Sequence, residues 1–168
     1  YDRSIPPVIT INGANPVTVE LGSAYSDAGA SSVSSRGTSV SVSTSSNVDT
    51  SSVGSYTVTY SATDLNGNTT TATRTVNVED TTAPVVSVTG DNPATVELGT
   101  TYTDAGATAT DASGSITPVT TGTVDSNTVG TYTLTYTATD ASGNAATATR
   151  TVNVVDTTGS ERIATITA

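Results

Sequence analysis

An internal repeat restricts how this chain can fold more than any other feature of its sequence. The stretch from Pro7 to Ala30 returns, with most residues unchanged, from Pro84 to Ala107. The stretch from Val53 to Asp80 returns in the same way from Val129 to Asp156. A repeat that takes in both the beginning and the end of each copy indicates two copies of one structural domain.

The repeat predicts domain 1 at residues 1–80, domain 2 at residues 81–158 and a tail at residues 159–168. The tail follows Asp156-Thr157-Thr158 and lacks the Ala-Pro pair that opens the second copy. Three interpretations of the tail stay open: the start of a further module, a cloning remnant, or a strand given to a neighbouring subunit.

Apolar residues alternate with threonine and serine in the last third of each copy. Tyrosine, valine, leucine and alanine fill every second position from Tyr56 to Ala62 and from Tyr132 to Ala138. A period of two residues is that of a strand with one buried face. β-Branched residues are frequent throughout, and no helical period survives the many glycines. The sequence therefore predicts an all-β chain made of two small antiparallel sandwiches.

Turn residues follow the alternating segment of each copy. Asp64–Asn68 and Asp140–Asn144 both contain an opening Asp, a Gly and a closing Asn. The Asp accepts hydrogen bonds from backbone N–H groups two residues on, and the Gly supplies the positive φ of a bulged hairpin. We therefore expect a hairpin between the last two strands of each domain.

Three further motifs mark the second copy, and the last two of them recur in the first copy. In the second copy they run from Asp80 to Pro84, from Val96 to Ala107 and from Gly130 to Asn144, the last two as VELG-x-x-Y-x-D-x-G-A and G-x-Y-x-x-x-Y-x-A-x-D-x-x-G-N. In these motifs each copy resembles the bacterial surface-protein Ig-like domain and the related hyaline-repeat modules. The resemblance implies two tandem immunoglobulin-like antiparallel β-sandwiches joined by a short linker, with Tyr56 and Tyr132 at the position of a tyrosine corner.

The resemblance also implies an extracellular or cell-surface location and a structural role. Modules of this kind serve as spacers, so an adhesin stalk, a surface layer or a filament is expected, with neighbouring Ig-like modules or identical subunits as partners. An accessory module that binds carbohydrate or another cell-surface ligand is the alternative. Glycan sites usually display exposed aromatic rings, and the chain has no Trp or Phe, which argues against that alternative.

Charge and composition exclude several other functions. The formal net charge is −10, and the five cationic side chains are scattered, so we expect no nucleic-acid binding. No stretch approaches the roughly 20 apolar residues of a membrane span, so we expect no membrane insertion. Without His, Cys or Lys the chain has no Ser-His-Asp triad, no thiol nucleophile and no usual zinc site. We therefore expect no enzymatic activity.

Acidic residues point to a cation near the domain boundary. In an Ig-like sandwich the hairpin between the last two strands lies at the end where the chain enters. Five residues are then expected to converge at the junction of the two domains and to bind calcium there: Glu79, Asp80, Asp111, Asp140 and Asn144. Calcium takes six to eight oxygen ligands and would relieve repulsion among the carboxylates.

Two interpretations of these acidic residues stay open. Asp64 and Asp140 are also suited to capping their own turns without a metal. The first copy also lacks one of the candidate ligands, because Ser34 stands where the second copy has Asp111. Calcium is therefore the candidate cofactor of the junction alone, where it would stiffen the joint.

Two arginines occur in strands at positions of the buried face. Arg74 and Arg150 share the alternation phase of the apolar Val76 and Val152. An arginine at such a position is expected to be partly covered and paired with a carboxylate.

Overall fold

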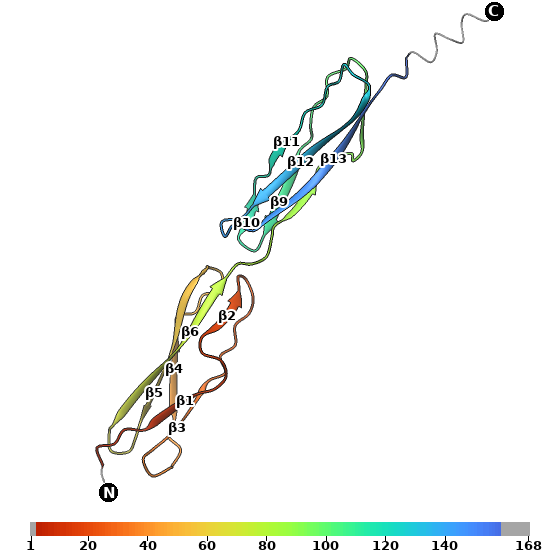
Figure 1. Cartoon of the computed structure of the whole chain (residues 1–168). Helices are drawn as coiled ribbons and strands as arrows, with labels where there is room; N and C mark the ends of the chain where they lie inside the picture. The colour runs from red at the N-terminus through yellow and green to blue at the C-terminus, as the bar shows by residue number, and fades with distance from the viewer. Residues whose placement is uncertain (1–2, 159–168) are drawn as a thin grey trace, which may run out of the picture. The chain divides into compact units, whose positions relative to one another are not determined.

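The computed structural model describes residues 3–158 (Figure 1). Regular secondary structure within these residues consists of β-strands alone, so the prediction of an all-β chain is confirmed. The chain divides into two compact units, unit 1 at Tyr1–Thr81 and unit 2 at Thr82–Ala168. The predicted tail at residues 159–168 lies outside the described residues.

Unit 1 is a sandwich of a four-stranded sheet, in the order β2-β6-β5-β4, and a two-stranded sheet of β1 and β3. Its strands are β1 (Val8–Ile11), β2 (Val17–Glu20), β3 (Ala30–Val33), β4 (Val42–Ser46), β5 (Gly54–Thr63) and β6 (Thr69–Glu79). The long β5–β6 hairpin forms where the Asp64–Asn68 turn predicts it, with Thr63 opposite Thr69.

Unit 2 repeats this arrangement, with sheets in the order β11-β12-β13-β8 and β10-β9-β7. Its strands are β7 (Val85–Val88), β8 (Ala94–Glu97), β9 (Ala107–Asp111), β10 (Gly114–Ile116), β11 (Val119–Thr121), β12 (Gly130–Thr139) and β13 (Ala145–Val155). The counterpart of β10 in unit 1 is an isolated bridge between Val33 and Ser39.

The core of each unit is small and lies between its two sheets. In unit 1 the fully buried Val58, Tyr60 and Val76 of the β5–β6 hairpin pack against partly buried residues of β1 and β2. Burial alternates strictly along β5 and along β12, as the two-residue period predicts. Valine and tyrosine thus supply most of the interior, as expected from a chain without Phe, Trp or Met.

One strand pair in each unit runs parallel within the otherwise antiparallel sandwich. β2 lies parallel to β6, and β8 lies parallel to β13. Before β2 the chain leaves the β1 sheet, and the Asn15 amide then bonds to the edge of β6: Nδ2 donates to Thr73 O (3.0 Å) and Oδ1 accepts from Thr75 N (3.0 Å). An asparagine amide therefore begins the ladder that β2 continues.

A tyrosine corner is present in both units. The Tyr56 hydroxyl donates to the carbonyl of Ser52 (2.8 Å), and the Tyr132 hydroxyl donates to the carbonyl of Thr128 (2.9 Å). A tyrosine near the start of the penultimate strand that bonds back to the upstream backbone is a hallmark of such sandwiches. The role predicted for both tyrosines is confirmed.

Candidate functional site

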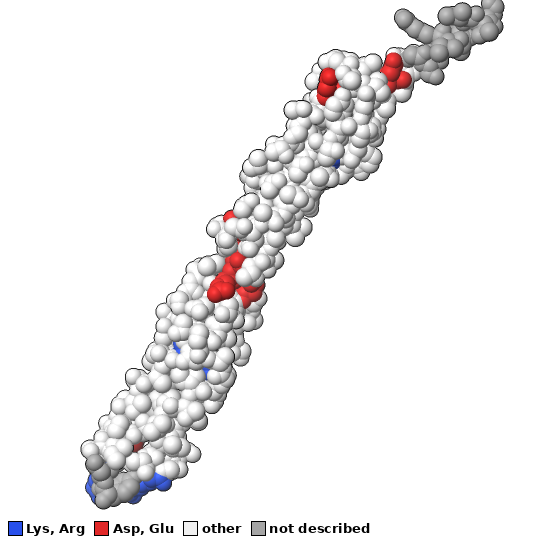
Figure 2. Space-filling view, in the orientation of Figure 1, with Lys and Arg blue, Asp and Glu red and all other residues white. Residues whose placement is uncertain are grey.

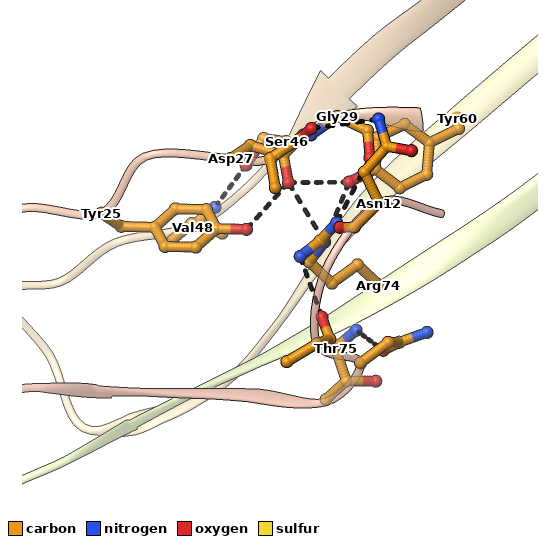
Figure 3. Close-up of polar contacts among 12 residues, drawn as sticks. Asn12, Tyr25, Asp27, Gly29, Ser46, Val48, Tyr60, Arg74 and Thr75 are labelled. Carbon is orange, nitrogen blue, oxygen red and sulfur yellow. Dashed lines mark hydrogen bonds and ion pairs between the residues drawn. The ribbon is translucent and has the colours of Figure 1, made fainter. Parts of the chain in front are cut away.

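The most strongly bonded charged group of unit 1 is the Arg74 guanidinium in β6 (Figure 3). Arg74 is only 2% exposed, and its Nε lies 3.2 Å from Asp27 Oδ1 while donating to the Tyr60 hydroxyl at 3.0 Å. A buried charge requires a counter-charge and hydrogen-bond acceptors. The predicted pairing with a carboxylate is confirmed, and the arginine is more deeply buried than predicted.

The remaining donors of Arg74 bond to loop backbone. Its guanidinium nitrogens donate to the carbonyl of Asn12, to that of Ala14 (2.9 Å) and to that of Gly29 (3.3 Å). Two loops that meet at one end of the β1–β3 sheet are thereby attached to β6. The arginine consequently acts as a cross-brace between the two sheets of the sandwich.

Asp27 is the acceptor at the centre of the cluster. Its carboxylate accepts from the Tyr60 hydroxyl (2.7 Å), the Tyr25 hydroxyl (3.0 Å) and the Gly29 N–H (3.1 Å). Burial alone would raise the pKa of Asp27, but these hydrogen bonds and the charge of Arg74 together lower it. Burial and the neighbouring carboxylate raise the pKa of Tyr25 to about 12. The aspartate is therefore ionised and its tyrosine partner neutral across the physiological range.

Unit 2 contains the matching cluster, with the difference that Arg150 Nε is buried without a hydrogen-bond partner. Arg150 is 2% exposed, its Nη1 lies 3.4 Å from Asp104 Oδ1, and its Nη2 donates to loop carbonyls that include Gly106 O (3.2 Å). Asp104 accepts from the Tyr136 hydroxyl (2.7 Å) and the Tyr102 hydroxyl (3.2 Å). The sequence pattern did not indicate these aspartates as the partners, although both belong to the recurring Y-x-D-x-G-A motif.

A second recurring contact involves the glutamate of the VELG motif. Glu20 accepts from the N–H (2.9 Å) and hydroxyl (2.8 Å) of Thr81, and Glu97 accepts from the N–H (2.9 Å) and hydroxyl (2.7 Å) of Thr157. Each glutamate thus holds the segment that follows the last strand of its unit. We call the end of a unit where its last strand finishes the distal end, and the end where the chain enters the proximal end.

Three of the predicted calcium ligands lie together at the proximal end of unit 2. Val85 of β7 pairs with Thr110 of β9, which places the chain entrance beside Asp111 at the end of β9. Carboxylate oxygens of Asp111 and Asp140 lie within 4.8 Å of one another. Asn144 Nδ2 donates to Asp140 Oδ2 at 2.8 Å.

Asp140 caps the β12–β13 hairpin. It is 7% exposed, and its Oδ1 accepts from the N–H groups of Ser142 (2.9 Å) and Asn144 (2.8 Å). Burial would raise the pKa of Asp140, but the hydrogen bonds from the Asn144 side chain and from the turn backbone lower it. Asp64 caps the matching hairpin of unit 1 through Asn66 N (2.8 Å) and Asn68 N (3.0 Å). The turn-capping interpretation is confirmed for both aspartates, and the metal interpretation stays a prediction.

Asp111 is only half satisfied by its own turn. Its Oδ1 accepts from Ser113 N (2.7 Å), Ser113 Oγ (2.6 Å) and Gly114 N (3.1 Å). Its Oδ2 is buried without a hydrogen-bond partner. A buried carboxylate oxygen without a donor is costly unless a cation or water faces it. Glu79 is the last residue of β6, and Asp80 follows it in unit 1. That these two residues also bind the calcium ion stays a prediction.

A family model described as "Bacterial surface protein, Ig-like domain" matches residues 9–78 and residues 86–154. The chain belongs to this family. Both Ig-like copies predicted from the repeat are thereby confirmed, and the family indicates a bacterial surface protein. The described part of this Ig-like chain contains no helix of the length and apolar character that a bilayer crossing needs.

No curated protein matches the Ig-like chain in a sequence search. Among solved structures, the lipoprotein BT2262 from Bacteroides thetaiotaomicron is 16% identical over 86% of this chain and 98% of its own, with a TM-score of 0.41. The fibronectin(III)-like modules of CbhA from Clostridium thermocellum are 18% identical over 89% of this chain and 94% of theirs, with a TM-score of 0.34. The ZmpB catalytic domain with its CBM51-1 and CBM51-2 domains from Clostridium perfringens is 16% identical over 90% of this chain and 31% of its own, with a TM-score of 0.45. These likenesses are too distant to bear on function.

The proximal end of Ig-like unit 1 has a different composition. Ser34 replaces Asp111, so only Asp64 remains of the two neighbouring carboxylates. The Asn68 amide bonds to Asp64 Oδ2 (2.8 Å) and to the carbonyl of Arg3 (2.7 Å), which attaches the incoming chain to the hairpin. Among the residues at 3–158, the neighbouring pair of carboxylates formed by Asp111 and Asp140 in unit 2 thus has no counterpart at this end of unit 1.

Proposed function

We propose that the two Ig-like units form a non-catalytic spacer of a bacterial surface or secreted protein, in an adhesin stalk, a surface layer or a filament. The duplicated Arg–Asp–Tyr cluster carries this proposal. A binding or catalytic site needs accessible groups, whereas Arg74 and Arg150 are each 2% exposed and are bonded to the backbone of their own unit. Both units thus use their strongest charged contacts to hold themselves together.

Pulling single molecules between two handles tests the spacer role. A spacer of independent modules should lengthen in two steps of similar size, one for each unit, and should refold when the force is released. A single step for the whole chain would contradict the proposal. A glycan array with saturable binding would favour the carbohydrate- or cell-surface-binding accessory module in its place.

We further propose that calcium binds at the proximal end of unit 2 through Asp111 and Asp140. Two observations support this site. Asp111 Oδ2 is buried without a hydrogen-bond partner, and carboxylate oxygens of Asp111 and Asp140 lie within 4.8 Å of one another. Carboxylate oxygens are the ligands that calcium prefers. Asn144, Glu79 and Asp80 are proposed as further ligands, the last two from the sequence only.

Melting curves in calcium and in chelator test the metal proposal. Calcium should raise the melting midpoint of the wild type and leave that of Asp111→Asn unchanged. Asp125→Asn is the matched control, because Asp125 also caps its own turn, through Asn127 N (3.0 Å), at the other end of unit 2. Glu79→Gln and Asp80→Asn show whether these residues add to the affinity. A wild-type midpoint that is equal in calcium and chelator would end the proposal.

A further inference from the structure

The four-stranded sheet of each unit ends in two edge strands, β2 and β4 in unit 1 and β8 and β11 in unit 2. An edge strand presents a row of backbone N–H and C=O groups to one side, and proteins commonly protect it with proline or charged residues. β2 directly follows Pro16, β8 follows Pro93 and β11 follows Pro118. β4 follows Ser41 and contains neither a proline nor a charged residue. Among these four strands, β4 is therefore the unprotected edge.

The pairing of β4 with β5 determines which backbone groups of β4 point outward. Asn47 N, one residue beyond β4, donates to Thr57 O of β5 (3.4 Å). Ladder bonds of an antiparallel pair recur at every second residue, so Val42, Thr44 and Ser46 direct their N–H and C=O groups away from β5. We call these three residues the outer edge of β4.

Unit 2 differs at two of the three matching positions. β11 pairs with β12 in the same register in which β4 pairs with β5. Pro118 therefore stands where β4 has Val42, and proline has no N–H to donate. Gly122 stands where β4 has Ser46, and its φ of 98° lies outside the extended region. The matching edge is thus closed to a further strand in unit 2 and open in unit 1.

The surface beside β4 is uncharged. Ser43 and Ser45 of β4 lie opposite Ser61 and Thr59 of β5 on the outer face of the sheet. Figure 2 shows an almost entirely white surface over the middle of unit 1, with charged side chains mainly near its ends. Two copies of a chain with a net charge of −10 repel each other, and an uncharged strand is where they approach at least cost.

The sequence after unit 2 contains a segment that suits this edge. Residues 163–167, which lie outside the described residues, read IATIT and match the five residues of β4 in number. They carry no charge, and all but Ala164 are β-branched, which favours a strand. Apolar and polar residues alternate from 164 to 167, as in the strands of both units. Residues 159–162 add about 13 Å of extended chain between unit 2 and this segment.

We propose that residues 163–167 of one copy of this chain pair with the outer edge of β4 in a second copy and extend its sheet by one strand. Backbone hydrogen bonds hold the added strand. With Ala164 and Ile166 on the core side, the strand covers the partly buried Val42, and its threonines continue the polar outer face. The contact joins two different surfaces, so it repeats from copy to copy in an open assembly. It gives the proposed spacer a partner and rests on that role.

Sedimentation velocity of the full chain and of two variants tests this pairing. The wild-type sedimentation coefficient should rise with protein concentration, whereas deletion of residues 159–168 should keep the chain monomeric. Thr44→Pro should also prevent association, because it removes an outward N–H and leaves the bonds between β4 and β5 in place. Thr120→Pro is the matched control, since it makes the same change at the protected edge of unit 2 and should associate like the wild type.

A mixture of the two non-associating variants gives the sharpest result. Thr44→Pro still has the donor segment, and the deleted chain still has an intact β4. The mixture should therefore form pairs of one chain each and nothing larger. The deletion leaves both units complete, so its result does not depend on how well Thr44→Pro folds.

Three outcomes would overturn the inference. They are a wild type that stays monomeric as its concentration rises, a mixture that does not form pairs, and association that survives the deletion. Survival of association in the deleted chain together with its loss in Thr44→Pro would indicate that two β4 strands pair with each other instead. The number of unfolding steps under force does not depend on these results, so failure of the strand pairing and failure of the spacer role are distinguishable.

Discussion

Arg74 in unit 1 and Arg150 in unit 2 each pair with an aspartate that accepts from two tyrosine hydroxyls, and each donates to the carbonyls of nearby loops. The proximal ends of the same units differ, with Ser34 where Asp111 stands and with basic residues around it. The interior of this Ig-like module is thus constrained by its own folding. Its ends are free to vary with the neighbour that each must meet.

The cluster explains how so small a core can hold a sandwich together. A domain of this size buries only about 60% of its unfolded surface, and this one has no Phe, Trp or Met to enlarge its core. The arginine replaces missing apolar contacts by bonding β6 to loops of the opposite sheet. The two units should therefore respond alike to changes in the cluster and differently to changes at their ends.

The largest expected effect comes from removing the carboxylate of the cluster. Asp27→Ala leaves Arg74 buried without its counter-charge, which typically costs about 3–5 kcal/mol. Calorimetry should show the transition of unit 1 lowered and that of unit 2 unchanged, with the reverse for Asp104→Ala. Asp49→Ala, which removes an exposed carboxylate that caps its own turn, serves as the control. Equal behaviour of all three variants would show that the cluster does not stabilise the units.

Alkaline and acid unfolding should affect both units through the same cluster. The pKa of Tyr25 and that of Tyr136 are raised to about 12 by burial and by the neighbouring aspartates. A tyrosine with a raised pKa contributes stability that is complete below about pH 10 and is lost as the pH rises toward 12. The total loss is about 2–3 kcal/mol for each of the two structural units. The pKa values of Asp27 and Asp104 are lowered, so their contribution is present above about pH 4 and is lost at lower pH.

Urea unfolding as a function of pH measures both the alkaline and the acid loss of stability. Tyr25→Phe should remove part of the alkaline loss in unit 1 and leave unit 2 as it was. Loss of stability in the wild type between pH 7 and pH 9 would contradict the assignment, because none of the four groups titrates in the folded state there.

The two-residue period predicted the all-β fold and the covered position of Arg74, and the Asp64–Asn68 turn predicted the β5–β6 hairpin, because each depends on local sequence. It did not indicate Asp27 as the partner of Arg74, since Asp27 lies in a loop without periodicity and reaches β6 only after the sheets have packed. The parallel pairing of β2 with β6 was missed for the same reason. Turn capping by Asp140 is local and was predictable, whereas the unsatisfied Asp111 Oδ2 depends on tertiary burial.

The tyrosine corners should contribute equally in the two units. Tyr56→Phe and Tyr132→Phe each remove one hydroxyl that donates to a loop carbonyl. The loss of such a hydrogen bond costs about 0.5–1.5 kcal/mol. Chemical denaturation should give similar losses for both variants, each confined to its own unit. A clear inequality would show that the common interior is not energetically equivalent in the two copies.

The smallest expected effect comes from giving unit 1 the proximal residues of unit 2. The variant Arg3→Asp/Ser34→Asp/Arg36→Ser places new carboxylates near Asp64, at a partly exposed position where like-charge repulsion costs on the order of 1 kcal/mol or less. In chelator, unit 1 of the variant should lose that amount of stability, and in calcium it should regain it. The substitutions should leave the stability of unit 2 as it is in the wild type. Asp111→Ser, the reverse exchange, should remove the calcium response of unit 2. If the engineered unit 1 ignored calcium while wild-type unit 2 responded, the ligands of unit 2 would have to include groups that the repeat does not duplicate. Paired carboxylates alone would then not define the site.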